Sequence, residues 1–222
     1  MHGNNSFQPL IPSSVIALSA GINTIIFDLG GVIIDLSIEK TVTAFSRLTG
    51  FSPLDIQQAY ATTPFFKAYE RGEVSDQEFR DSIRKHFSTH ASDAEIDHCW
   101  NAMLVDLPVS TLTMLENLKK HFRVFALSNT NTIHINYVNE IMLQGKVLDS
   151  WFHKAYYSHR LGMRKPELEI YRHVLEQNRL IPEQTIFLDD NLDNLKAANS
   201  LYIQTRHITH LQQVRDLFNS YD

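Results

Sequence analysis

The sequence contains a single cysteine, Cys99, and one cysteine cannot form an internal disulfide. Without further cysteines beside it, Cys99 also argues against a structural zinc site. We therefore expect a reducing compartment, the cytoplasm, because disulfides persist in oxidising ones. Two histidine pairs, His86/His90 and His207/His210, lack an accompanying carboxylate frame or third ligand, and we interpret them as surface residues.

Basic runs and long apolar runs are missing as well. Twenty Lys and Arg stand against 25 Asp and Glu, which gives a formal net charge of −5. Nucleic-acid binding relies on clustered basic groups, and a transmembrane helix needs roughly 20 apolar residues in a row. We therefore expect neither a nucleic-acid nor a membrane partner, and the sequence leaves the oligomeric state open.

The composition that remains is that of a folded protein. Hydrophobic residues make up 43% and charged residues 20% of the 222 residues, which is ordinary globular usage. This length permits one large domain or a domain with an insertion. At the start of the chain, prolines 9 and 12 interrupt the apolar residues and the first 14 residues include no Lys or Arg. We interpret residues 1–22 as a flexible extension rather than a secretory signal.

Three short apolar runs each end in polar residues. They are Ile25–Phe27 before Asp28, Val124–Leu127 before Ser128, and Ile186–Leu188 before Asp189. Runs without alternation are typical of strands that are covered on both faces. Weaker strand candidates are Phe152–Tyr157 and Tyr202–Thr205, and helical periodicity covers 109–120 and 167–177. This alternation predicts a doubly wound, mainly parallel α/β sheet.

Residues 37–107 interrupt this alternation. They contain no convincing strand but several helix starts, among them the capping boxes Ser75–Glu78 and Ser92–Glu95. A crossover between parallel strands needs only about a dozen residues. We therefore expect a helical cap over 37–107, inserted into a core formed by 23–36 and 108–222.

The polar residues that end the strands are expected to meet. Ligands of open α/β sheets bind at the carboxyl ends of the strands. There the sequence places Asp28, Ser128, Asn129, Asp189 and Asp190. Each residue alone could equally cap a helix. Three neighbouring carboxylates, however, repel one another unless a hard cation lies among them, and an oxygen-only ligand set favours Mg²⁺.

Lys165 adds a positive charge to this set. It precedes Pro166, which suits the first position of a helix and holds Lys165 extended, so we expect an ammonium group beside a helix N-terminus. Such an end binds anions. A carboxylate nucleophile, a metal site, a hydroxyl and an ammonium together predict phosphoryl transfer through an aspartyl-phosphate.

These segments resemble, in order, the four motifs of haloacid dehalogenase-like (HAD-like) hydrolases. The segments are Phe27–Ile33, Leu127–Thr130, Gly162–Pro166 and Leu188–Asn194. With Glu70–Glu73 in the cap, the chain is most similar to bacterial sugar-phosphate phosphatases of the glucose-1-phosphatase type. The resemblance covers about Asn23 to Arg206. It implies a HAD-like Rossmannoid core, Mg²⁺ as cofactor and a small phosphorylated metabolite, such as a sugar phosphate, as substrate.

The resemblance also implies roles for single residues. Asp28 is expected to be the nucleophile and a Mg²⁺ ligand. The backbone carbonyl of Gly30 and the carboxylate of Asp190 are further expected ligands, with Asp189 binding directly or through water. Asn194 is expected to support these ligands from behind. The groups expected to hold the phosphoryl oxygens are Ser128, Asn129 and Lys165.

Gly30 departs from the family pattern. Most phosphatases of the family carry there an aspartate that protonates the leaving alkoxide, a contribution of about 10²–10⁴-fold. An anomeric leaving group could do without it, or a cap residue, Asp35 or a water could replace it. Two alternative functions follow: a non-catalytic module that binds phosphorylated metabolites, and a 2-haloacid dehalogenase. Dehalogenases need no Mg²⁺, so the Asp189–Asp190 pair disfavours the second.

Overall fold

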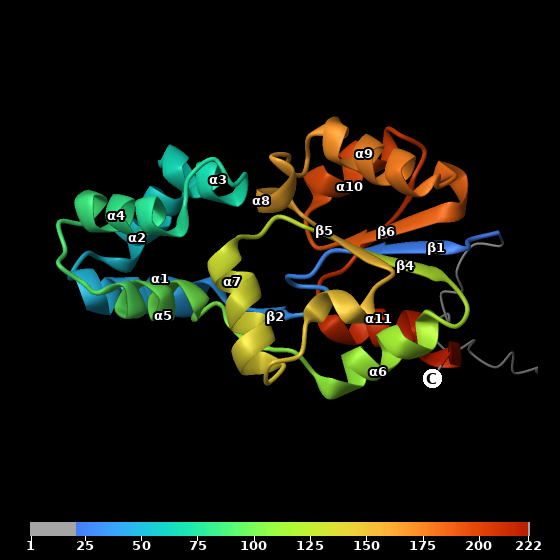
Figure 1. Ribbon diagram of the computed structural model, residues 1–222, viewed down its shortest axis with the longest axis horizontal. Coiled ribbons are helices and arrows are strands. Elements are labelled where there is room, and N and C mark those ends of the chain that lie inside the picture. The colour runs from blue at the N-terminus through green and yellow to red at the C-terminus, as the bar shows by residue number, and fades with distance from the viewer. Residues whose placement is uncertain (1–20, 222) are drawn as a thin grey trace, which may run out of the picture.

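The central feature is a sheet of five parallel strands in the order β5-β4-β1-β6-β7 (Figure 1). The computed structural model describes residues 21–221, so the expected N-terminal extension lies almost entirely outside the described residues. The strands are β1 Thr24–Phe27, β4 Arg123–Ser128, β5 Lys154–Tyr157, β6 Thr185–Asp189 and β7 Gln204–His207. The predicted parallel sheet is confirmed, although β7 begins two residues after the expected start.

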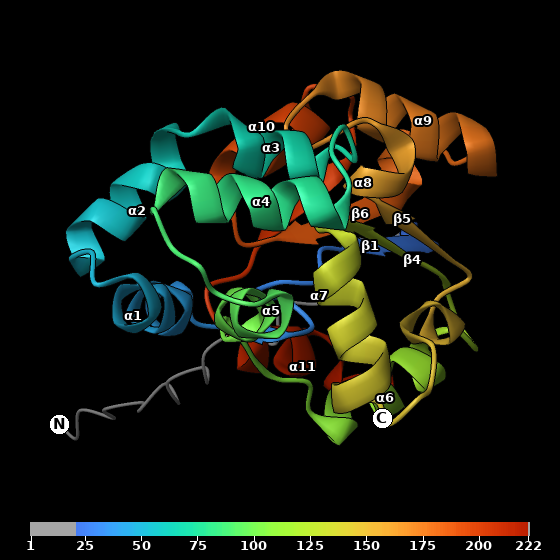
Figure 2. The same ribbon diagram turned by 60° about the vertical axis from the view of Figure 1, so that its left-hand side comes forward.

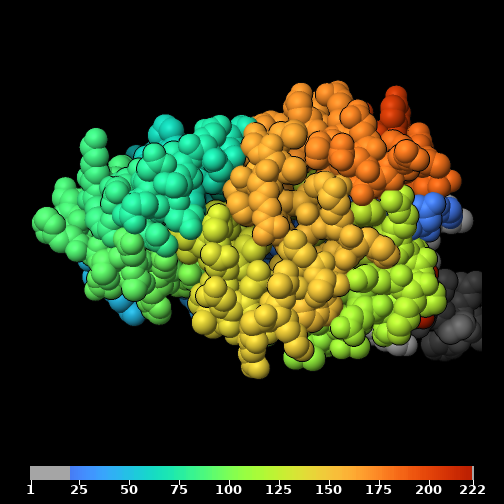
Figure 3. Space-filling model, viewed as in Figure 1, coloured from blue at the N-terminus to red at the C-terminus, as the bar shows by residue number. Residues whose placement is uncertain are grey.

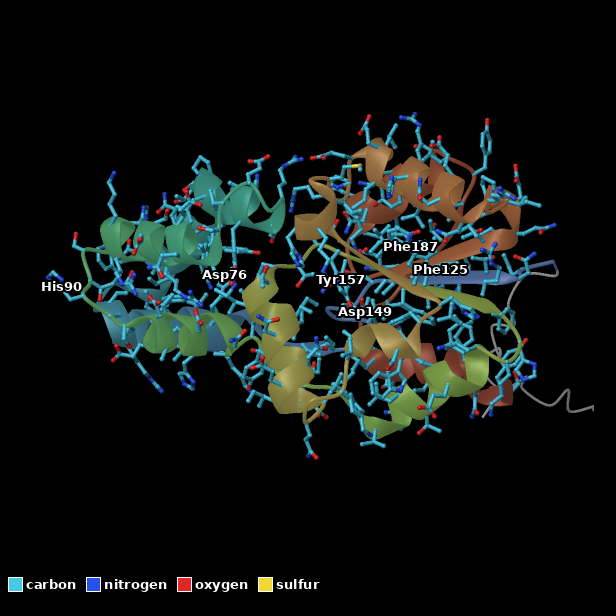
Figure 4. The ribbon with its side chains drawn as sticks, in the orientation of Figure 1. Asp76, His90, Phe125, Asp149, Tyr157 and Phe187 are labelled. Carbon is cyan, nitrogen blue, oxygen red and sulfur yellow. The ribbon has the colours of Figure 1, made fainter. Side chains whose placement is uncertain are left out.

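Helices cover both faces of this sheet. In Figure 1, α9 and α10 lie above the sheet, and α6 and α11 lie below it. On the upper face Phe125 and Phe187 pack in one cluster with residues of α9 and α10, and Figure 4 labels both rings. The helices of the core are α6 Val109–Leu118, α7 Thr132–Tyr137, α8 Ser158–Leu161, α9 Leu168–Asn178, α10 Leu192–Asn199 and α11 Leu211–Phe218. The sheet is therefore doubly wound, as the apolar runs predicted.

Five further helices form a separate group between β2 and β3, the inserted cap (Figures 1 and 2). They are α1 Ile38–Thr49, α2 Pro53–Thr62, α3 Pro64–Glu70, α4 Asp76–His86 and α5 Asp93–Asn101. The predicted capping boxes open α4 and α5, and a third one opens α2. The cap has its own apolar cluster, in which Phe79, Ile83 and Ile96 are fully buried. Figure 4 shows His90 at the cap's outer end, as a surface residue.

The expectation of no strand within 37–107 is wrong. Strand β3, Leu104–Asp106, pairs antiparallel with β2, Asp35–Leu36. The chain leaves the core for the cap and returns beside the same place, so the two connecting segments run side by side and pair. With only two and three residues, these strands are too short to show an alternating pattern.

The cap touches the core near α8. Figure 3 shows the cap surface against the segment that follows β5. Gly72, just after α3, has φ +69°, and a Cβ there would lie 2.1 Å from the carbonyl oxygen of His159. Only glycine fits this approach of two backbones. Among the described residues no helix is long and apolar enough to cross a membrane.

Candidate active site

The carboxyl ends of β1, β4 and β6 lie side by side. Phe27 of β1 pairs in register with Ala126 of β4 and Leu188 of β6. The next residues therefore include Asp28, Asp189 and, one position on, Asp190. A carboxylate oxygen from each of these three lies within 4.8 Å of the others. The structure thus brings the three predicted carboxylates together.

Lys165 lies between two of these carboxylates. Its Nζ is 2.9 Å from Oδ1 of Asp28 and 2.7 Å from Oδ2 of Asp189, and its side chain is 1% exposed. The expectation that Pro166 begins a helix is wrong, because α9 begins at Leu168 and Glu167 is its N-cap. The Lys165–Pro166 bond is cis. Through its contacts with Asp28 and Asp189, the ammonium group faces the carboxylates, not a helix N-terminus.

The side chain of Asn129 holds the backbone of Lys165. Its Nδ2 donates to the carbonyl oxygen of Lys165 at 2.9 Å, and its Oδ1 accepts from the N–H of Lys165 at 2.8 Å. Both ends of the amide are thus engaged. The Nδ2 group keeps a second hydrogen, so both this group and the backbone of Asn129 remain available to a phosphoryl oxygen. Its side chain positions the lysine.

Asp189 is fully buried and held from several sides. Its Oδ1 accepts from the backbone N–H of Asn191 at 2.8 Å. The side-chain amide of Asn194 donates to both carboxylate oxygens, at 3.0 and 3.1 Å. Asn194 therefore lies behind Asp189. On the other side of the cluster Gly31 has φ +72°, and a Cβ there would lie 2.7 Å from Oδ2 of Asp190, so glycine is needed beside this carboxylate.

The charges of the cluster do not balance. Burial raises the pKa of Asp28 to about 7, with repulsion from Asp189 and Asp190 adding to it and Lys165 opposing it. Burial and Asp189 also raise the pKa of Asp190. Burial alone would lower the pKa of Lys165, but Asp189 and Asp28 outweigh it and raise this pKa. When all three carboxylates are ionised, one ammonium leaves two negative charges, which a divalent cation would neutralise.

Two hollows adjoin the cluster. A cavity of about 140 Å³ is lined by Gly30 and Ser128 of the core and by residues of the cap. An open groove of about 710 Å³ is lined by Asp35, Asp190 and neighbours. Asp35, a candidate for the missing acid, lies in this groove and is not among the residues lining the cavity. A Cβ at position 30 would lie 2.4 Å from Cδ1 of Leu36, so Leu36 fills the space of the usual aspartate.

Four charged residues join cap and core, and the sequence alone predicts no role for them. Glu70 binds Arg164 through two hydrogen bonds, and Arg71 binds Glu167 through two more. Arg164 and Glu167 flank Lys165 in the sequence. The available signal was the charged run 70–73, but its partners lie more than 90 residues away and their pairing depends on the fold.

Comparison with known proteins agrees with this arrangement. A model of haloacid dehalogenase-like hydrolases matches residues 22–201. The D-ribitol-5-phosphate phosphatase of Bacteroides thetaiotaomicron is 31% identical over 83% of this chain and 90% of its own length.

Two solved structures share the fold. A HAD family enzyme of Bacteroides thetaiotaomicron, in complex with magnesium and inorganic phosphate, has a TM-score of 0.77 and 35% identity over 84% of this chain and 94% of its own. A HAD-like hydrolase of Porphyromonas gingivalis has a TM-score of 0.78 and 28% identity over 85% and 91%. The chain therefore belongs to the haloacid dehalogenase-like hydrolase family.

Proposed function

We propose that the protein is a Mg²⁺-dependent phosphatase of small sugar or polyol phosphates, with Asp28 as the nucleophile. The observation that carries this proposal is the cluster of Asp28, Asp189 and Asp190 with Lys165 inserted among them. The ribitol-phosphate phosphatase relative and the structure similar to this chain, with magnesium and phosphate bound, support it. We further propose that the cap extends over 37–107, between the core segments 23–36 and 108–222.

The residues present fit Mg²⁺. All three side chains offer carboxylate oxygens, the ligands that this ion prefers, and the cluster has two negative charges in excess. Asp28, Asp190 and the carbonyl of Gly30 would hold the ion, and Asp189 would act directly or through water. When bound, Mg²⁺ supplies charge stabilisation to the transferring phosphoryl group.

The reaction then follows from the residues of the chain. A carboxylate oxygen of Asp28 attacks phosphorus, the bond to the leaving oxygen breaks, and the leaving alkoxide takes up a proton. Water next attacks the aspartyl-phosphate, releasing inorganic phosphate and restoring the carboxylate. Lys165, Ser128 and Asn129 bind the phosphoryl oxygens. Lys165 can do so because its ammonium stays charged between Asp28 and Asp189.

Removal of the metal tests this function directly. We expect hydrolysis of phenyl phosphate and of polyol phosphates with Mg²⁺, and a loss of at least about 10²-fold in EDTA, since the ion offsets charge at the reacting phosphoryl group. Added Mg²⁺ should restore the rate. Ca²⁺ should support it poorly, because it takes more ligands at longer distances. Release of phosphate at the same rate with and without EDTA would exclude the mechanism.

Asn194→Ala tests the support behind Asp189. Loss of the amide removes one donor from each carboxylate oxygen of Asp189, and loss of such supporting groups weakens metal binding by about 10–100-fold. We expect the Mg²⁺ concentration for half-maximal activity to rise by that factor. Asn199→Ala, at the exposed end of α10, is the matched control. An unchanged Mg²⁺ requirement in Asn194→Ala would contradict the assignment.

A non-catalytic module that binds phosphorylated metabolites is the second candidate. Leu36 occupies the space of the missing acid beside Gly30, which favours this reading. A panel of phosphate esters separates the two candidates, because binding without hydrolysis across the panel would favour the module. Chloride release from a 2-haloacid would instead indicate a dehalogenase.

A further inference from the structure

The cavity beside the cluster carries one acidic side chain among its described lining residues. It is Glu70, the last residue of α3 in the cap. The other cap residues that line the cavity are aromatic or apolar, apart from the hydroxyl of Tyr60. Ser128 and Asn129 line the opposite, core side. A leaving group bound at Asp28 and extending toward the cap would therefore meet Glu70.

Glu70 presents one oxygen without a partner. Its side chain is 14% exposed, and Oε2 accepts hydrogen bonds from Nε and Nη2 of Arg164 at 3.2 and 2.8 Å. Among residues 21–221 no donor reaches Oε1. Because Arg164 compensates the charge, the carboxylate can stay ionised in a largely buried place. The structure therefore provides a fixed acceptor at the wall of the cavity.

Tyr60 provides a donor in the same cavity. Its ring is fixed against Phe66 and Trp100, at centroid distances of 5.2 and 6.1 Å. Burial and the nearby Glu70 raise the pKa of Tyr60 to about 12, so the phenol keeps its proton. Its hydroxyl has no hydrogen-bond partner within the part of the chain that the structure describes. A hydroxyl group both donates and accepts, which matches this pair of side chains.

We propose that Glu70 determines specificity by accepting a hydrogen bond from a hydroxyl of the leaving group, and that Arg164 is the positioning residue for its carboxylate. This inference rests on the proposed phosphatase function and specifies its substrates. They are phosphates of short polyols or sugars, and the cavity of about 140 Å³, with room for roughly four or five water-sized groups, takes up part of such a leaving group.

The same ion pairs connect this recognition to the phosphate site. Glu70 binds Arg164, Arg71 binds Glu167, and the segment between them contains Lys165. A hydroxyl bound by Glu70 is thus held at a fixed position relative to the segment that contains Lys165. A leaving group without hydroxyls gives Oε1 no partner in the substrate, and a site built for a hydroxyl discriminates strongly against such an analogue.

The test compares Glu70→Gln with wild type on two substrates. Ribitol 5-phosphate has hydroxyls on its leaving group, and phenyl phosphate has none. A hydrogen bond to a charged group corresponds to about 10–150-fold in an equilibrium. We expect kcat/KM for ribitol 5-phosphate to fall by about 10–100-fold and that for phenyl phosphate by less than about threefold. A similar fall on both substrates, or none on either, would overturn the proposal.

Arg71→Met is the matched control. It breaks the neighbouring ion pair between cap and core without altering a residue that lines the cavity. If Glu70 only anchored the cap, Arg71→Met would change the ratio of the kcat/KM values for the two substrates in the same way as Glu70→Gln does. We expect it to change both rates by the same factor. Glu73→Gln, at a carboxylate that is 59% exposed, should change neither.

A binding measurement separates this inference from the proposed function. In the Asp28→Asn background, at a Mg²⁺ concentration that saturates this variant, calorimetry compares the binding of ribitol 5-phosphate with that of inorganic phosphate. Adding Glu70→Gln should weaken the binding of ribitol 5-phosphate about tenfold or more. The affinity for inorganic phosphate should stay within about twofold. If wild type hydrolyses no ester but this binding difference holds, the proposed function fails and the role of Glu70 stands. Equal effects on both ligands would refute the role of Glu70.

Discussion

Asp28→Asn is expected to abolish hydrolysis while making the metal-free protein more resistant to heat. The asparagine amide does not attack phosphorus, so no aspartyl-phosphate forms. Loss of a covalent nucleophile costs about 10⁴-fold or more in kcat. The measurement is phosphate release with Mg²⁺. Asp193→Asn, at an exposed carboxylate that pairs with Lys196, is the control and should keep its rate.

The gain in stability follows from the pKa of Asp28. Burial raises this pKa from 3.8 to about 7 in the folded protein. Between these two values the folded state binds more protons than the unfolded state, so the free energy of unfolding falls as pH rises through this window. Above about pH 7 the full cost of the buried charge is present. Asparagine carries no such cost.

We therefore expect the variant in EDTA to melt about 2–6 °C above wild type at pH 8, with the difference vanishing near pH 4. With Mg²⁺ the wild type should have the higher Tm, since the ion stabilises only a protein that binds it well. A lower Tm of the variant at pH 8 in EDTA would show that attraction to Lys165 outweighs burial.

The strands and the carboxylate cluster could be predicted from the sequence because both depend on local features. Unbroken apolar runs indicate buried strands, and parallel strands bring the polar residues at their ends to one edge. Asp28, Asp189 and Asp190 meet for that reason. The paired helix caps Ser75–Glu78 and Ser92–Glu95 are equally local.

The remaining features depend on contacts between distant segments. Asn129 was expected to hold a phosphoryl oxygen, and the loop of Lys165 also comes close enough to contact both ends of its amide. Lys165 was expected at a helix N-terminus, whereas the two carboxylates attract it into the cluster. Glu70 and Arg164 are 94 residues apart, and no spacing rule pairs them. Charged side chains have several possible partners in a sequence, and the fold selects among them.

Lys165→Met is expected to have the largest effect on stability. The lysine is 1% exposed and contacts two carboxylates, of which Asp189 is 0% exposed. Removing one partner of a buried ion pair costs about 3–5 kcal/mol, because the other charge stays buried and unpaired. For a protein of this size the Tm should fall by about 6–20 °C in EDTA. Lys196→Met, which breaks an exposed pair with Asp193, should cost less than about 1 kcal/mol.

Two further measurements distinguish a lost charge from a lost packing contact. Without the ammonium, the pKa of Asp28 rises further, so the loss of stability should be greatest near pH 8 and smaller near pH 4. Mg²⁺ offers another cation to the same carboxylates and should restore part of the Tm. Activity should still fall by about 10²–10³-fold, because the phosphoryl group loses its ammonium partner. If the loss in Tm is independent of both pH and Mg²⁺, Lys165 stabilises the protein through the packing of its aliphatic chain and not through its charge.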